Sequence, residues 1–205
     1  MVRSLAVALA LLVLAAGCDS DEKPVPARIV VSAAGNVGKL HVDRSDRAAV
    51  IAFVGRPDAE RHSSEGGASA RYDALGYDCE GKLSERTFPL VSYPYHAPYC
   101  RTIFWIDVTS GRLENFFTTD SRYFEAHGIH IGMATAVSER LLHKRLFEGC
   151  NTNFYLDSAR DRTLTVAVTG GAPRHPKKSL RVTGGHVYAF VLHSRRRDAG
   201  VFDCL

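Results

Sequence analysis

The chain has 205 residues, of which 45% are hydrophobic and 23% charged, and its formal net charge is +4. This is the composition of an ordinary globular protein with enough apolar residues to bury a core. The small excess of positive charge is spread along the sequence, so it argues against a nucleic-acid partner.

The N-terminal residues have the order of a secretory signal. Arg3 precedes an apolar segment at residues 5–16, and no acidic residue occurs before Asp19. The apolar run is shorter than the roughly 20 residues that a transmembrane helix needs. We therefore predict a signal peptide at residues 1–17 and an exported protein.

The next motif is "LAAGCDS", in which the small residues Ala16 and Gly17 directly precede Cys18. It resembles the lipobox of bacterial lipoproteins, although Ala15 stands where most lipoboxes have leucine. The resemblance implies cleavage before Cys18 and acylation of its thiol, for example with palmitate. Residues 18–27 would then be a lipidated cysteine and a flexible tether, holding the chain to the extracytoplasmic side of a cell membrane bilayer. The alternative is an ordinary signal peptide that leaves Cys18 as a free thiol.

Four further cysteines remain when Cys18 is set aside, an even number that suits two disulfides in an exported protein. They allow three connectivities. The four residues are Cys79, Cys100, Cys150 and Cys204.

Residues 38–58 and 128–150 share a pattern that indicates an internal duplication. Each begins with a short alternating apolar segment, typical of a strand, and continues with a helical apolar period. Ser45 or Asp46 can cap the first helix and Thr135 the second, while Gly55 and Gly149 suit the ends of the helices.

β-rich segments follow each helix, with a hairpin turn at residues 109–112 in the first half and a turn near residues 195–200 in the second. We therefore predict an α+β fold of two tandem units, residues 28–118 and 119–205. Each unit has a short strand, a helix and an antiparallel sheet, with the helices packed on one face of the sheet. A single α+β domain with a chance similarity is the alternative. The duplication pairs Cys79 with Cys100 and Cys150 with Cys204.

The segment "GIHIGMATAVSERL", followed by the glycine-terminated helix and the antiparallel sheet, resembles the repeat of β-lactamase-inhibitory protein. It is also similar to the small outer-membrane lipoproteins of the barrel-assembly machinery. The first copy departs from this pattern, because Asp43 and Arg44 stand where the second has Gly132 and Met133. The resemblance implies the architecture and a protein-binding sheet, and we transfer no inhibitor residue.

Motifs for catalysis or metal binding are missing from the sequence. The nine histidines form no His-Glu-x-x-His motif, and the cysteines form no Cys-x-x-Cys pair. The alternating Ile129 and Ile131 place His127 and His130 on a strand edge, which is a weak metal site. The predicted disulfides occupy the candidate nucleophilic thiols. We expect no catalytic residue, no metal and no cofactor.

The segment between Cys79 and Cys100 is the predicted binding region. Its tyrosines alternate with prolines, which stiffen the backbone and present large amphipathic rings. Alternatively, these rings cover the open end of the sheet. The predicted partner-binding residues are Tyr93, Tyr95, Tyr99 and Trp105.

We therefore predict an envelope lipoprotein that acts as a protein-interaction module without catalytic activity. Its expected partner is an envelope protein or a cell-wall glycan. The main alternative is an extracytoplasmic protein that binds or senses a small ligand between the sheet and the helices. An envelope hydrolase is the third class.

Overall fold

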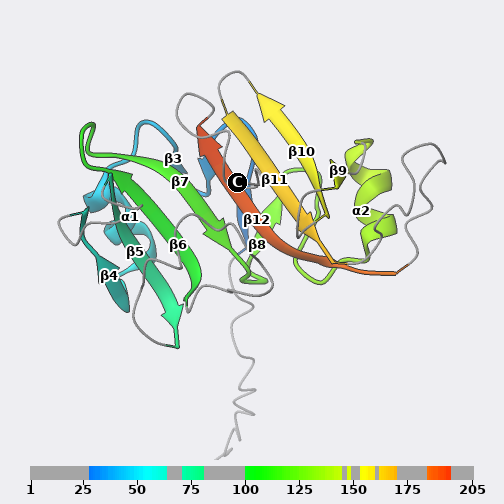
Figure 1. Ribbon diagram of the computed structural model, residues 1–205, viewed down its shortest axis with the longest axis horizontal. Helices are drawn as coiled ribbons and strands as arrows, with labels where there is room; N and C mark the ends of the chain where they lie inside the picture. Colours follow the sequence, from blue (N-terminus) through cyan, green and yellow to red (C-terminus); the bar gives the residue numbers. More distant parts are fainter. Residues whose placement is uncertain are drawn as a thin grey trace, which may run out of the picture.

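A continuous antiparallel sheet of eight strands forms the centre of the fold (Figure 1). The computed structural model describes residues 28–63, 71–80, 100–144, 147–148, 153–159, 162–169 and 184–194. The strand order is β4-β5-β6-β7-β12-β11-β10-β9. The strands are β4 (Ala59–Arg61), β5 (Tyr72–Cys79), β6 (Cys100–Asp107), β7 (Arg112–Thr118), β9 (Phe147–Glu148), β10 (Asn153–Ala159), β11 (Arg162–Val168) and β12 (Val187–Ser194).

A second, four-stranded sheet has the order β3-β2-β1-β8. Its strands are β1 (Ile29–Val31), β2 (Asn36–Val37), β3 (Leu40–His41) and β8 (Tyr123–Glu125). β8 pairs in parallel with β1, whereas the other pairs in this sheet are antiparallel. Two helices complete the described part of the chain, α1 (Arg47–Val54) and α2 (Thr135–Leu142), and they lie towards opposite ends of the large sheet (Figure 1).

The predicted α+β class with helices covering one face of the sheet is wrong, because the described chain is mostly β. Each described helix has only eight residues, which is about two turns. A helix of that length covers little of an eight-stranded sheet. Instead, Val31 and Val37 of the four-stranded sheet contribute to the same core as the large sheet.

The first helix follows its sequence signals and the second does not. Asp46 caps α1 by accepting a hydrogen bond from the backbone N–H of Ala49 at 2.9 Å, and Gly55 ends the helix. In the second helix the predicted cap, Thr135, is already the first helical residue. That helix ends before the predicted Gly149, because His143 adopts a left-handed conformation.

The main core lies between the two sheets, on what we call the first face of the large sheet. Phe104 of β6 contacts Phe116 of β7, and Phe116 contacts Tyr123 of β8, with ring centroids 5.0 and 5.2 Å apart. Val50 of α1 and Leu142 of α2 belong to the same cluster. Both helices and the four-stranded sheet are therefore anchored on this face.

A second apolar cluster lies on the opposite face of the large sheet, which we call the second face. Its buried members come from the sheet strands and include Trp105, Phe117, Tyr188 and Val191. Alternation along each strand explains the two clusters, since successive side chains point to opposite faces. Among the described residues, no helix and no strand of the small sheet contributes to this second cluster.

The two halves of the chain use corresponding backbone contacts before each helix. Nδ1 of His41 lies 2.6 Å from the carbonyl oxygen of Val42. In the same way, Nδ1 of His130 lies 3.0 Å from the carbonyl oxygen of Ile131. Two residues further, Asp43 and Gly132 both have positive φ, 70° and 88°. Their N–H groups donate to the backbone carbonyls of Leu113 in β7 and Val187 in β12, respectively. Aspartate is among the residues that tolerate this conformation best, so Asp43 can stand where the second half has glycine. The division into two units stays a prediction.

The predicted disulfide between Cys79 and Cys100 is present and joins directly paired residues of β5 and β6. The hairpin predicted at residues 109–112 connects β6 to β7. Cys18, Cys150, Cys204 and the turn predicted near residues 195–200 lie outside the described residues. Neither described helix has the length and apolarity required to cross a membrane.

Stability is expected to fall at alkaline pH because of two core tyrosines. Burial raises the pKa of Tyr77 and of Tyr123 to about 12, above the ordinary value of about 10. Their stabilising contribution is complete below pH 10 and is lost as the pH rises to 12, because the unfolded chain releases these protons first. We expect about 2 to 3 kcal/mol from Tyr123 and less from Tyr77, which is the more exposed of the two.

Urea unfolding between pH 8 and pH 12 measures this loss of stability, and the Tyr123→Phe variant should lose less than half as much as the natural chain. An equal loss in both chains would show that Tyr123 does not contribute to the alkaline transition.

Candidate functional site

Polar and aromatic side chains form a row across the second face of the large sheet. Arg61 pairs with Ala74, Ala74 with Trp105, and Trp105 with Asn115 across neighbouring strands. The row continues on β12 and β11. Directly paired residues of an antiparallel sheet point to the same face. The polar row, as we name it, consists of Arg61, Trp105, Asn115, His193 and Thr163.

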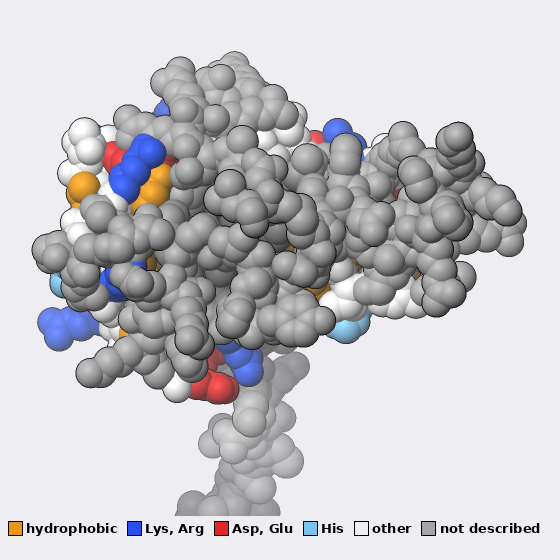
Figure 2. Space-filling view, viewed as in Figure 1, with side chains coloured by type: hydrophobic (Ala, Val, Ile, Leu, Met, Phe, Trp, Pro, Cys, Tyr) orange, Lys and Arg blue, Asp and Glu red, His pale blue; other side chains and the backbone are white. Residues whose placement is uncertain are grey.

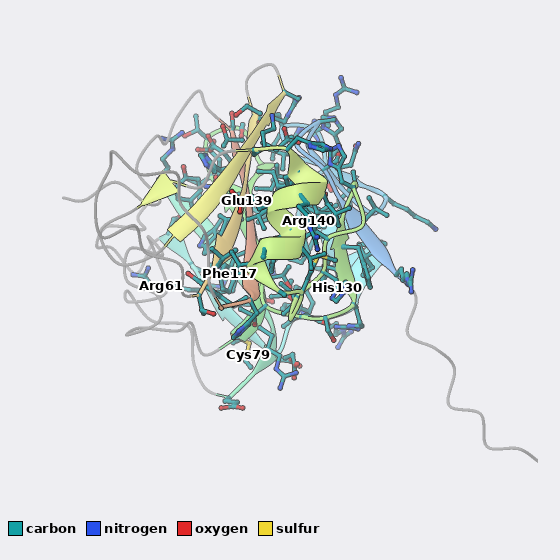
Figure 3. The ribbon with its side chains drawn as sticks, turned by 90° about the vertical axis from the view of Figure 1, so that its right-hand side faces the viewer. Arg61, Cys79, Phe117, His130, Glu139 and Arg140 are labelled. Atoms are coloured by element: carbon teal, nitrogen blue, oxygen red, sulfur yellow. A yellow bond between two sulfur atoms is a disulfide. The ribbon has the colours of Figure 1, made fainter. Side chains whose placement is uncertain are left out.

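Every member of the polar row is buried, and Arg61 and Trp105 are 4% and 1% exposed. Arg61 lies on one side of the large sheet and His130, in the segment after β8, on the other (Figure 3). The opposite placement agrees with the contacts, because the His130 ring lies against Phe124 of the small sheet. The row is therefore separate from the core between the sheets.

Asn115 is the unusual member of the row. Its side chain is 2% exposed, and neither its amide nitrogen nor its amide oxygen has a hydrogen-bond partner. The hydroxyl of Thr165, in the neighbouring row of the same face, is also buried without a partner. A buried polar group without a partner costs about 1–3 kcal/mol. Most buried polar groups in proteins are bonded, so these two call for an explanation.

Of the predicted partner-binding residues, only Trp105 lies within the described chain. It occupies the centre of the second cluster, between Ala74 and Asn115, and is almost fully buried. Cys100 belongs to the same cluster, and Cys79 packs against it. The predicted residues Tyr93, Tyr95 and Tyr99 lie outside the described residues.

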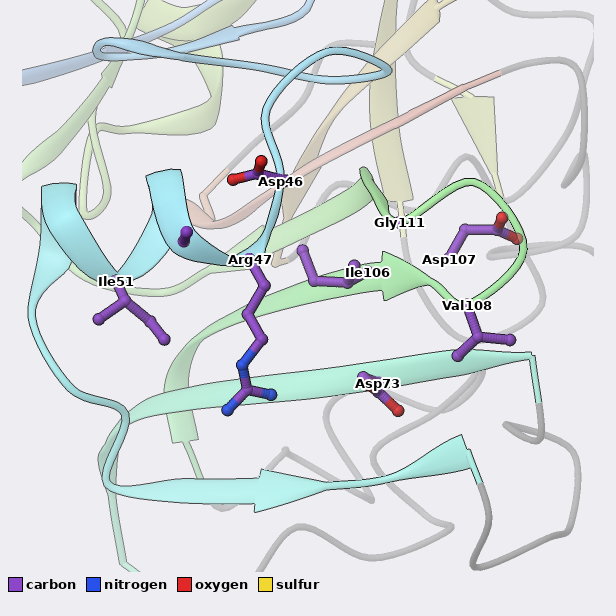
Figure 4. Close-up of a pocket in the computed structure, with 9 residues that line it drawn as sticks. Asp46, Arg47, Ile51, Asp73, Ile106, Asp107, Val108 and Gly111 are labelled. Atoms are coloured by element: carbon purple, nitrogen blue, oxygen red, sulfur yellow. The ribbon is translucent and has the colours of Figure 1, made fainter.

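A cleft of about 480 Å³ opens on the first face, between α1 and the paired strands β5 and β6. Arg47 and Ile51 line it from the helix, and Asp73 and Ile106, which pair directly, line it from the strands. Figure 4 shows the Arg47 side chain reaching from the helix across the strands. The β6–β7 turn closes one end with Val108.

Three of the four ionisable groups lining this cleft have partners of opposite charge. An Nη atom of Arg47 lies 2.6 Å from a carboxylate oxygen of Glu60. The buried Asp107 carboxylate accepts a hydrogen bond from Nε of Arg71 at 2.9 Å. A carboxylate oxygen of the N-cap residue Asp46 lies 3.8 Å from an Nη atom of Arg112.

The fourth group, Asp73, accepts a hydrogen bond from the backbone N–H of Ser63 at 2.9 Å. His62 also lies 3.8 Å from the Asp73 carboxylate. Among the described residues, Asp73 is thus the lining carboxylate without an arginine beside it.

The histidines of the segment after β8 do not form a joint site. Nδ1 of His127 lies 2.7 Å from the buried carboxylate of Glu125, whereas His130 contacts Phe124. Asp157 completes a group of three possible ligand atoms with Glu125 and His127, all within 4.8 Å of one another. Lys144 lies 3.2 Å from Asp157, so ion pairs account for this arrangement.

Sequence reasoning missed Asn115 and Thr165. It placed an alternative ligand site between the sheet and the helices, where the cleft lies, but named none of its lining residues. A single asparagine in the segment "RLENFFTT" has no local signal of function. Comparison of the chain with protein-family models, with characterised proteins and with solved structures finds no match.

Proposed function

We propose that the chain is a lipid-anchored envelope protein that binds a partner protein through the second face of its large sheet, without catalysis. The observation that carries this proposal is Asn115, a buried amide with neither of its polar atoms bonded. Such a group lowers the stability of the chain alone. A partner that supplies a donor and an acceptor to it would recover this cost on binding.

The surroundings of Asn115 support binding of a protein. Trp105 and Phe117 lie beside it, and aromatic residues contribute strongly to protein interfaces. The polar row also contains Arg61, and arginine is enriched at such interfaces. These side chains are nearly inaccessible in the chain alone, so the second face has to become accessible when the partner binds.

The absence of catalysis is proposed partly from the cysteines. Cys79 and Cys100 are joined, and an oxidised thiol cannot attack a substrate. The membrane anchor follows from the resemblance of the sequence around Cys18 to a lipobox.

The test is a crosslinking pull-down from membranes of cells that express the full-length chain. We expect the chain in the membrane fraction, with a specific protein captured, and we expect Cys18→Ala to move the chain into the soluble fraction. Capture of no protein from membranes would overturn the proposed binding function. Retention of the Cys18→Ala variant in the membrane would overturn the anchor and leave the binding function in place.

A further inference from the structure

We propose that the cleft between α1 and strands β5 and β6 binds a small primary ammonium ion that carries an aliphatic chain. This site is separate from the second face, because Asp73 and Ile106 point to the first face, towards α1. The inference therefore does not rest on partner binding.

The size and lining of the cleft suit a small organic molecule. Its volume of about 480 Å³ is within the usual range of about 300–1,000 Å³ for ligand sites. Ile51 on the helix and Ile106 on the strand supply aliphatic lining. Val108 at the turn is 47% exposed, whereas most large apolar side chains of the described residues are buried. An alkyl chain along these residues would cover Val108.

The surface near this turn combines apolar and charged side chains. Figure 2 shows apolar side chains next to basic and acidic ones where Figure 1 places the β6–β7 turn.

The charge balance selects a cation. Three carboxylates and one guanidinium line the cleft, which gives an excess of two negative charges. The direct ion-pair partners are Glu60, Arg71 and Arg112, and Arg71 in turn pairs with Glu114. Counted together, these two carboxylates and two guanidinium groups cancel, so the excess of two negative charges remains. The local potential is therefore negative and favours a positively charged ligand.

Asp73 is the group that would hold the ammonium. It lies on the floor beside Ile106, and the other lining carboxylates already have arginine partners. An ammonium offers three donors and no acceptor, and it forms charge-assisted hydrogen bonds with a carboxylate. The Asp73 oxygens accept one backbone N–H and retain capacity for more.

The test uses the full chain and three probes of equal length, hexylammonium, hexan-1-ol and hexanoate, titrated at low ionic strength by NMR. We expect saturable binding of hexylammonium, with shifts of the Ile51 and Ile106 methyl groups, and much weaker binding of the other two. Asp73→Asn should weaken hexylammonium binding by about tenfold, since it removes the charge and keeps an acceptor for Ser63. Arg47→Gln should tighten it about threefold, because it removes the one lining cation.

Asp78→Asn is the matched control, because Asp78 lies on the same strand, is exposed and does not line the cleft. It should change the affinity less than twofold. Equal binding of hexan-1-ol and hexylammonium would overturn the proposal, as would unchanged affinity of a folded Asp73→Asn variant or no binding of hexylammonium. These outcomes would not affect binding on the second face, which the membrane pull-down tests separately.

Discussion

The Asn115→Leu variant is expected to be more stable than the natural chain by about 1–3 kcal/mol, as measured by urea unfolding. Leucine has the same branching as asparagine and no polar atoms, so it removes the cost of burying an unbonded amide. The variant should at the same time bind the partner less well. A substitution that raises stability and weakens binding is expected at a residue whose role is to bind the partner.

Two threonine variants control for the general effect of removing a buried polar group. Thr165→Val is expected to stabilise the chain by about 1 kcal/mol, because the Thr165 hydroxyl has no partner. Thr102→Val is expected to destabilise it by a similar amount, because the Thr102 hydroxyl lies 2.9 Å from that of Thr118. Destabilisation by Thr165→Val and Asn115→Leu alike would show that both groups are satisfied in the folded chain.

Loss of the disulfide has the other large expected effect. The Cys79→Ala/Cys100→Ala variant is expected to lose about 3 kcal/mol of stability, because the bond joins residues 21 positions apart and restricts the unfolded chain. Urea unfolding of the variant and the natural chain measures this difference.

The same measurement with a reducing agent is the control. Reduction should remove the difference between the two chains, because both then lack the bond. A non-reduced variant with a free energy of unfolding equal to that of the natural chain would contradict the stabilising role of the bond.

The sequence predicted those parts of the fold that depend on local signals. Asp46 and Gly55 mark the ends of α1, and the turn at residues 109–112 connects β6 and β7. The end of α2 was not predicted, because His143 takes the left-handed conformation usually given to glycine. Nothing in its local sequence indicates this.

Only β3 of the four-stranded sheet lies where a short strand is predicted, at the start of residues 38–58. The other three strands of this sheet have two or three residues, too few for a visible period. One of its pairings also joins residues distant in sequence, since Ile29 of β1 pairs with Tyr123 of β8. This sheet accounts for much of the error in fold class, because it packs on the face of the large sheet that the helices were expected to cover.

The candidate site shows the same division between local and non-local information. Trp105 is named from the sequence because it lies on the strand that adjoins the segment between Cys79 and Cys100, and its partner-binding role stays a prediction. Asn115 and His193 are 78 positions apart in the sequence, and only the pairing of β7 with β12 places them side by side. No local pattern reports this pairing.

Binding of the captured membrane partner by the Asn115→Leu variant tests the central claim most directly. The control is Asn36→Leu, which makes the same change at an exposed position on β2, in the small sheet. We predict that Asn115→Leu, folded and at least as stable as the natural chain, binds the partner at least tenfold more weakly, whereas Asn36→Leu binds normally. Equal affinity of the Asn115→Leu variant and the natural chain would contradict the proposal that the second face binds the partner.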